Sequence, residues 1–145
     1  MKNKYMDRIH KINCVLTDTN AIYHQVAVKL GLSDSAMFVL YMLEYKGGSC
    51  LLNDVCKELG ISKQTVNSTI RKLENDDIIY LEQDKGKTKR ICLTEKGKPF
   101  AKQTGGRLLE IECKVMAEWG DEEIEQYIRL TEKYNALFSE QIKKL

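Results

Sequence analysis

The sequence has 145 residues, which is enough for one domain with a real hydrophobic core, or for a domain with an added dimerisation element. Charged residues make up 30% of the chain and proline occurs once, a composition that argues against an intrinsically disordered chain and favours helices. The formal net charge of +2 identifies no partner by itself, and the longest apolar run, residues 36–43, is far too short to cross a bilayer. We therefore expect a globular cytoplasmic protein with no membrane partner.

The cysteines are odd in number and form no CxxC pair. A disulfide framework is therefore not expected, and the thiols are predicted to be reduced and to serve mostly in packing. The five are Cys14, Cys50, Cys56, Cys92 and Cys113.

Two helices are predicted in the first third of the chain. Apolar residues recur at helical spacing over residues 4–30, which indicates a long amphipathic helix ended by Gly31. Ser33 is a suitable N-cap for a second helix over residues 34–46, and a Gly-Gly pair ends that helix. The second helix is apolar nearly all round, so it should be buried centrally.

A helix-turn-helix is predicted next. Residues 52–59 place four apolar side chains on one helix face and are followed by Gly60, and Ser62 is a good N-cap for a helix that reaches residue 75. The turn between the two helices has about three or four residues and contains glycine, which is typical of a helix-turn-helix.

The second of these helices has an unusual exposed surface. Val66, Ile70 and Leu73 fall on one side and are predicted to face the core. The rest of the surface carries amides, hydroxyls and an arginine, although Ser, Thr and Asn lower helix propensity. A role other than helix stability is therefore expected, and these groups suit hydrogen bonding to base edges and phosphates.

A β-hairpin with a basic tip follows. Residues 78–83 and 90–93 are rich in β-branched and apolar side chains and flank the polar turn DKGKTK. Between Lys85 and Lys102 there are seven basic residues and one acidic residue, a local charge of +6. Such a charge is typical of a surface that contacts phosphates.

One long helix and a final helix are predicted beyond the hairpin. Thr94 is a candidate cap for a helix to about Trp119, with Pro99 delaying its regular start and Gly105-Gly106 bending it. The last helix is expected over residues 122–143. Its aromatic residues suit either an intramolecular core or a dimer surface, and we favour the dimer because so small a chain offers them little else to pack against. They are Tyr127, Tyr134 and Phe138.

A helix-turn-helix followed by a two-stranded hairpin is a winged helix. The predicted fold class is therefore mainly α (α+β), a winged helix-turn-helix with long N- and C-terminal dimerisation helices. The expected partners are double-stranded DNA and a second copy of the chain. The predicted DNA-binding residues are Ser62, Lys63, Gln64, Thr65, Asn67, Ser68, Arg71, Lys85, Lys87, Lys89 and Arg90.

The segment DVCKELGISKQTVNSTIRKLENDDIIYLEQD, followed by RICLTEKGK, resembles the MarR family of bacterial transcription regulators. In that family a Leu-Thr-x-x-Gly element closes the wing, and here it is Leu93, Thr94 and Gly97. The resemblance implies one MarR-like domain over residues 1–145, with a DNA-binding part at 34–98 and a helical dimerisation part at 1–32 and 99–145. It also implies a sequence-specific regulator, a repressor that binds an inverted-repeat operator as a homodimer and responds to a small aromatic effector or an oxidant.

Three positions depart from the family pattern. Asp77 replaces the usual glycine at the end of the second helix, and aspartate tolerates the left-handed conformation that this position needs. The wing lacks the usual Asp-x-Arg motif, so Lys85, Lys87 or Arg90 would take the place of a wing arginine. Pro99 lies near the start of the following helix and changes how that helix leaves the wing.

Two sensing sites are conceivable from the sequence. Tyr23, His24, Met37 and Tyr41 could line a ligand cavity between the first two helices, although packing also accounts for the methionine and tyrosines. Cys14 could act as a redox sensor, although a lone cysteine on an amphipathic helix more often packs. The two histidines, His10 and His24, have no metal-ligand spacing, so neither a metal nor a cofactor is expected.

An enzyme and a protein-binding adaptor are the competing function classes. The sequence has no Gly-rich phosphate loop and no nucleophile-base motif, so an enzyme is not expected. Winged helices also serve as protein-interaction modules, in which the recognition helix tends to lose its polar and basic face. The retained polar face therefore favours DNA over a protein partner.

Overall fold

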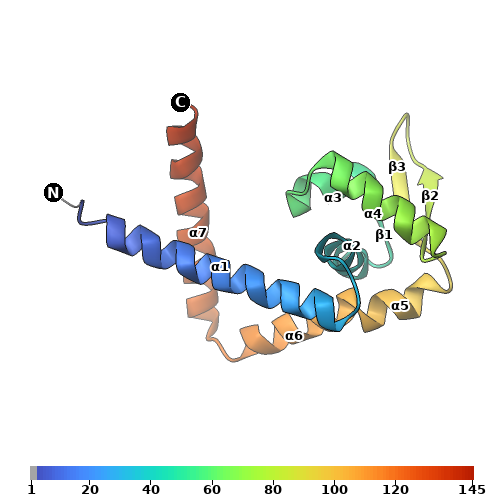
Figure 1. Ribbon diagram of the computed structural model, residues 1–145, viewed down its shortest axis with the longest axis horizontal. Helices are drawn as coiled ribbons and strands as arrows, with labels where there is room; N and C mark the ends of the chain where they lie inside the picture. Colours follow the sequence, from blue (N-terminus) through green and yellow to red (C-terminus); the bar gives the residue numbers. More distant parts are fainter. Residues whose placement is uncertain (1–2) are drawn as a thin grey trace. The chain divides into compact units, whose positions relative to one another are not determined.

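The computed structural model describes residues 3–145. Contacts divide the chain after Leu109 into a first unit, which holds the winged helix, and a second unit over Glu110–Leu145. Figure 1 shows the helices and strands in chain order. They are α1 (Met6–Lys29), α2 (Asp34–Tyr45), β1 (Ser49–Leu51), α3 (Leu52–Leu59), α4 (Lys63–Asn75), β2 (Ile79–Gln83), β3 (Lys89–Leu93), α5 (Gly97–Gln103), α6 (Gly105–Ala117) and α7 (Asp121–Ile142).

The first two helices form where the sequence predicts them. Gly31 ends the first with a left-handed φ of 70°, and the Ser33 hydroxyl accepts a hydrogen bond from the Ala36 amide at 3.1 Å to cap α2. The prediction that α2 is central is confirmed, because Met37, Leu40 and Leu43 are fully buried.

The predicted helix-turn-helix is also confirmed. Gly60 adopts the left-handed conformation after α3, with φ 61°, and the Ser62 hydroxyl accepts from the Thr65 amide at 3.2 Å to start α4. Val66, Ile70 and Leu73 are buried as expected, and they are joined by Thr69. These side chains hold α4 against the core of the winged helix.

The hairpin belongs to a three-stranded antiparallel sheet of order β1-β3-β2. β2 and β3 form the predicted hairpin, with Tyr80 opposite Cys92 and Gln83 opposite Lys89. β1 was not expected from the sequence; it pairs with the other edge of β3, placing Cys50 opposite Ile91. The sheet closes one side of a core that α2, α3, α4 and α5 complete.

The prediction of one continuous helix from Thr94 to about Trp119 is wrong, because the chain breaks at Thr104 into α5 and α6. Gly105 explains the break, since a Cβ at this residue would lie 2.1 Å from the Tyr41 backbone nitrogen in α2. The backbone of Thr104 turns, with φ −117° and ψ −89°, and its hydroxyl donates to the Phe100 carbonyl at 2.7 Å. The bend expected at the glycine pair is therefore a complete interruption one residue earlier.

The second unit contains the predicted last helix. Gly120 precedes α7 in an extended conformation, and three acidic residues occupy the first turn, where the helix dipole favours them. The rings of Trp119 and Tyr127 meet edge to face at 5.6 Å between centroids. Among the described residues, no single helix is long and apolar enough to cross a membrane, and only α1 and α2 together, bent by 86°, reach that length and composition.

Candidate nucleic-acid interface

The polar face of α4 is presented to solvent. Gln64, Thr65, Ser68 and Arg71 are exposed, and Asn67 is half-buried at the edge of that face. Ser62 and Lys63 lie exposed at the N-terminus of the same helix. The structure therefore brings together the seven predicted residues of α4 and its cap, with hydrogen-bonding groups pointing away from the core.

The two hydroxyls at the start of α4 have different roles. The Ser62 hydroxyl accepts from the Thr65 amide and donates to the Thr65 hydroxyl, with 2.9 Å between the two oxygens. Its proton is thus already used within the helix cap. The Thr65 hydroxyl keeps its own proton for a partner outside the helix.

A contact that sequence reasoning missed fixes how α4 lies on α2. The Ser35 and Thr69 hydroxyls are hydrogen-bonded at 2.8 Å. Thr69 is buried although it lies in a polar stretch of the sequence, and the only available signal was its position one residue before Ile70 on the core side. This hydrogen bond fixes the position of α4 along α2, in addition to the apolar contacts between the two helices.

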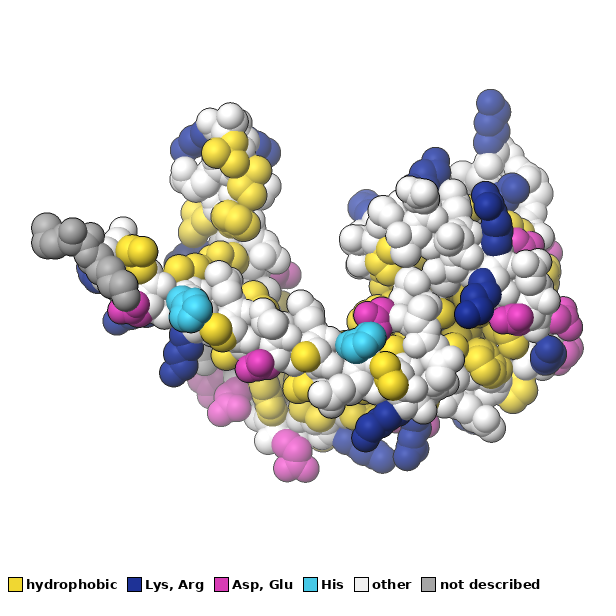
Figure 2. Space-filling model, viewed as in Figure 1, with side chains coloured by type: hydrophobic (Ala, Val, Ile, Leu, Met, Phe, Trp, Pro, Cys, Tyr) yellow, Lys and Arg dark blue, Asp and Glu magenta, His cyan; other side chains and the backbone are white. Residues whose placement is uncertain are grey.

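The wing has a short, internally bonded tip. Gly86 adopts φ 69°, the Asp84 amide donates to the Thr88 carbonyl at 3.0 Å, and the Thr88 hydroxyl donates to the Lys85 carbonyl at 2.6 Å. These bonds hold the turn while Lys85, Lys87 and Lys89 remain exposed. Figure 2 shows Lys and Arg side chains projecting from this part of the molecule.

Arg90 differs from the wing lysines. It is half-buried, and its Nη1 donates to the Ser49 hydroxyl on β1 at 3.4 Å. The arginine is therefore tied to the neighbouring strand at the foot of the wing rather than extended at the tip. The other three basic wing residues keep their side chains exposed, whereas the Arg90 side chain is bonded within the sheet.

Comparison with known proteins identifies the winged helix. The model of the MarR family matches residues 30–90, which run from the end of α1 through most of the wing. The part of the chain that matches this family is the winged helix. Among curated proteins, no sequence matches the chain significantly.

Solved structures share the fold over nearly the whole chain. A MarR family regulator from Neisseria meningitidis, NMB1585, has a TM-score of 0.81 at 20% identity and covers 99% of both chains. The MepR–DNA complex of S. aureus has a TM-score of 0.70 at 22% identity, covering 94% of this chain and 99% of that one. NadR bound to 4-hydroxyphenylacetate has a TM-score of 0.71 at 12% identity, covering 92% and 96%.

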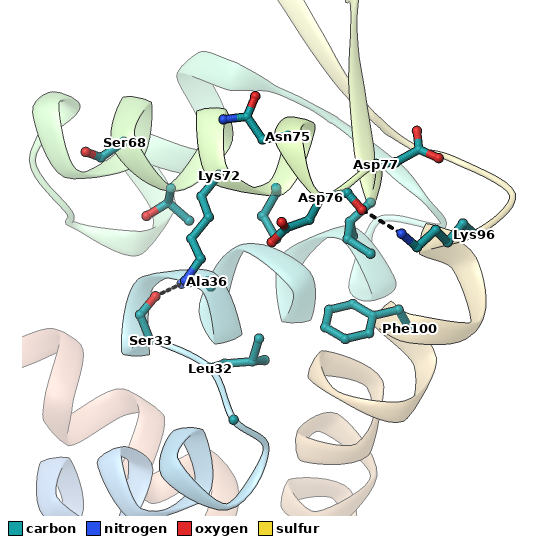
Figure 3. Close-up of a pocket in the computed structure, with 14 residues that line it drawn as sticks. Leu32, Ser33, Ala36, Ser68, Lys72, Asn75, Asp76, Asp77, Lys96 and Phe100 are labelled. Atoms are coloured by element: carbon teal, nitrogen blue, oxygen red, sulfur yellow. Dashed lines mark hydrogen bonds between the residues drawn. The ribbon is translucent and has the colours of Figure 1, made fainter.

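A pocket of about 820 Å³ lies beside α4 in the winged helix. Leu32, Ala36 and Phe100 contribute apolar walls, and most of the other lining residues are polar or charged, among them Lys72 of α4 and its C-cap Asp76. Figure 3 shows Phe100 and Leu32 facing the space between α2, α4 and α5. Small-molecule sites usually have mostly apolar walls with a few polar groups, and this pocket is more polar than that.

The four predicted ligand residues do not line that pocket. Met37 is fully buried in a cluster with Ala27 and Leu108, against which Tyr23 and Tyr41 pack. The ring of Tyr23 lies 5.5 Å from that of Phe38. His24 is exposed, with Nδ1 2.8 Å from the Asp34 carboxylate.

All five cysteines are free thiols; Cys14 and Cys113 are exposed, Cys56 is half-buried, and Cys50 and Cys92 are buried. Burial raises the pKa of Cys50 to about 11, and burial together with the nearby Glu82 carboxylate raises that of Cys92. Both buried thiols therefore stay protonated at neutral pH. The predicted redox residue Cys14 is exposed, with its Sγ 3.6 Å from His10 Nε2.

Proposed function

We propose that this chain is a sequence-specific, DNA-binding transcription regulator that acts as a homodimeric repressor. The observation that carries the proposal is the polar, exposed face of α4 beside a wing whose tip presents three lysines. A helix of this kind fits the major groove, and the wing supplies phosphate contacts next to it. The family match over residues 30–90 supports the same function.

The proposal divides the interface into two kinds of contact. Gln64, Ser68 and Arg71 hydrogen-bond base edges, with Thr65 and Asn67 beside them, and so set sequence preference. Lys63 and the wing lysines contact phosphates, which sets affinity and its salt dependence. Arg90, which bonds Ser49 in the free protein, positions the foot of the wing or reaches the backbone after that bond opens.

The proposed dimer is supported by the apolar surfaces of the terminal helices. Along α7, Tyr127, Leu130, Tyr134, Leu137 and Phe138 all leave much of their surface exposed, and Figure 2 shows hydrophobic side chains gathered there. α1 likewise exposes several apolar side chains. A second copy would cover such surfaces, and a two-fold would set the recognition helices about 34 Å apart on an inverted repeat.

A small organic effector is the proposed signal. NadR, whose structure contains 4-hydroxyphenylacetate, shares the fold, and the pocket beside α4 offers a site whose occupant would touch the recognition helix directly. The cavity predicted at Tyr23, His24, Met37 and Tyr41 remains the alternative site. Phenolic acids should release bound DNA from the wild type. The site that binds the effector is the one whose substitution abolishes this release.

The testing experiment is a fluorescence-anisotropy titration against the DNA upstream of the protein's own coding region and against a scrambled duplex, at several salt concentrations. Tight, salt-sensitive binding that prefers the upstream duplex is expected. Binding to neither duplex by a folded dimer at low salt would contradict the proposal and favour a protein-binding adaptor. Equal binding to both would leave DNA binding in place but not autoregulation.

A further inference from the structure

The recognition helix α4 ends in a Schellman motif. The Ile78 amide donates to the Leu73 carbonyl and the Asp77 amide to the Glu74 carbonyl, both at 2.9 Å. Asp77 has φ 58°, and among the described residues it alone combines a positive φ with a side chain. This position usually requires glycine, so the surrounding contacts must hold an unfavourable backbone conformation in place.

Three successive carbonyls after α4 are held by one short segment that follows the wing. The Asp76 carbonyl accepts from Lys96 Nζ at 2.9 Å. The Asp77 carbonyl accepts from the Thr94 hydroxyl at 2.6 Å, and the Ile78 carbonyl accepts from the Thr94 amide at 3.0 Å. We call these three bonds the α4 clamp.

The clamp also starts α5. The Thr94 hydroxyl accepts from the Gly97 amide at 2.8 Å, and the Lys98 amide donates to the Thr94 carbonyl at 3.0 Å. A Cβ on Gly97 would lie 1.9 Å from the Ile78 carbonyl oxygen, so only glycine allows this approach. One hydroxyl group thus joins the end of α4 to the beginning of α5.

The clamp lies where the wing begins and ends. β2 starts at Ile79, directly after the clamped carbonyls, and β3 ends at Leu93, directly before Thr94. The direction of α4 relative to the wing therefore depends on these bonds. Figure 3 shows Lys96 reaching from the start of α5 to the end of α4.

We propose that Thr94 is a positioning residue for sequence discrimination, acting through α4 and the wing without touching DNA. Base readout needs the helix to be held at one orientation in the groove while the wing engages the backbone. Loss of the Thr94 hydroxyl would leave the Asp77 carbonyl without its donor and free α4 to change its angle to the wing. This inference rests on the proposed DNA-binding function.

The test compares Thr94→Val, which keeps the shape and removes the hydroxyl, with Thr94→Ser, which keeps the hydroxyl. On the duplex that the wild type prefers, Thr94→Val is expected to bind about tenfold more weakly, because the Asp77 carbonyl and the Gly97 amide both lose their partner. Its affinity for the scrambled duplex and its salt slope should stay unchanged, since no phosphate contact is removed. Thr94→Ser should restore discrimination, which a general loss of side-chain packing would not predict.

Thr19→Val is the matched control, because the Thr19 hydroxyl also donates to a carbonyl, that of Val15 at 3.0 Å, but on the exposed surface of α1. It should leave discrimination unchanged. If Thr94→Val fails to fold, Lys96→Met removes another clamp bond and should lower discrimination at a constant salt slope. A salt slope reduced by about one in Lys96→Met would instead assign that lysine to a phosphate and overturn its place in the clamp.

The proposed function and the positioning role of Thr94 can be contradicted separately. A wild type that binds neither duplex overturns the proposed function, and the positioning role with it. A wild type that discriminates, together with a folded Thr94→Val that discriminates equally well, overturns the positioning role alone. Equal weakening of Thr94→Val on both duplexes also overturns it, because the clamp is proposed to act on sequence preference.

Discussion

The winged helix and the C-terminal unit differ in where their apolar side chains lie. In the winged helix, Leu40, Val55 and Ile91 are fully buried inside one core. In α7, no described side chain is buried, and Tyr127 and Phe138 are each more than half exposed. The first region is stabilised by burial within the chain, whereas the helix of the second leaves its apolar side chains exposed to solvent.

The largest expected effect is on assembly. Phe138→Glu places a charge on the exposed apolar face of α7, so we expect a monomer, and the loss of paired binding should weaken operator affinity by about a hundredfold. Sedimentation and anisotropy measure both. Ala136→Glu is the control because residue 136 lies on the opposite side of the helix from Phe138. An unaltered dimer in Phe138→Glu would place the interface elsewhere.

Two substitutions that shorten a leucine side chain to alanine test the difference between the regions directly. Leu40→Ala opens a cavity in the winged-helix core and should lower the free energy of unfolding by about 2–5 kcal/mol. Leu137→Ala on α7 should cost less, with a loss that depends on protein concentration if the proposed partner copy covers that face. Urea denaturation at two protein concentrations measures this difference. Equal, concentration-independent losses would contradict the comparison.

Within the interface, Arg71 should matter for discrimination. Arg71→Ala removes a side chain proposed to read a base, so it should cost about 1–3 kcal/mol of preference and relax specificity at one position of the operator. Binding to a panel of single-base operator variants measures this effect. A uniform loss over all variants would instead make Arg71 a phosphate contact.

Lys87 should give a smaller and more uniform effect. Lys87→Ala at the wing tip should weaken binding to operator and scrambled DNA alike and lower the salt slope by about one. Lys133→Ala in α7 is the charge-matched control, for which no change of slope is expected. The assignment fails if Lys87→Ala alters base preference and leaves the slope unchanged.

The smallest expected effect is a difference in the rate at which the cysteines are alkylated, with the fold unchanged. In native protein at pH 8, iodoacetamide should modify the exposed Cys14 and Cys113 before Cys50. Because burial raises the pKa of Cys50 to about 11, its contribution to stability is present below pH 9 and is lost as pH rises toward 11. Mass spectrometry of labelled peptides, with unfolded protein as reference, measures the order in which the cysteines react with iodoacetamide.

Local signals were sufficient for most of the helical fold. The caps at Ser33 and Ser62, the glycine stops and the buried face of α4 are encoded within a few residues of one another. The left-handed conformation of Asp77 was also predictable, because the residue follows the end of a helix, where glycine is usual, and aspartate tolerates that conformation. Placement of the predicted DNA-binding side chains of α4 on its solvent-facing side follows from helical periodicity alone.

Contacts between distant segments were not predictable in the same way. β1 has only three residues, and its strand conformation depends on pairing with β3 some forty positions later. The break at Thr104 depends on the approach of Gly105 to the backbone of α2. The Ser35–Thr69 bond and the Lys96–Asp76 bond likewise join residues whose sequence neighbourhoods do not indicate each other.

The strand order carries a consequence for protein synthesis. β3, the last strand to be made, is the central strand, with β1 and β2 on its two sides. While the chain leaves the ribosome, neither earlier strand has a partner until residues 89–93 emerge, so the sheet cannot assemble progressively. A nascent chain halted before Leu93 would expose two unpaired strands to chaperones and proteases, and the winged helix should become protease-resistant in a single late step.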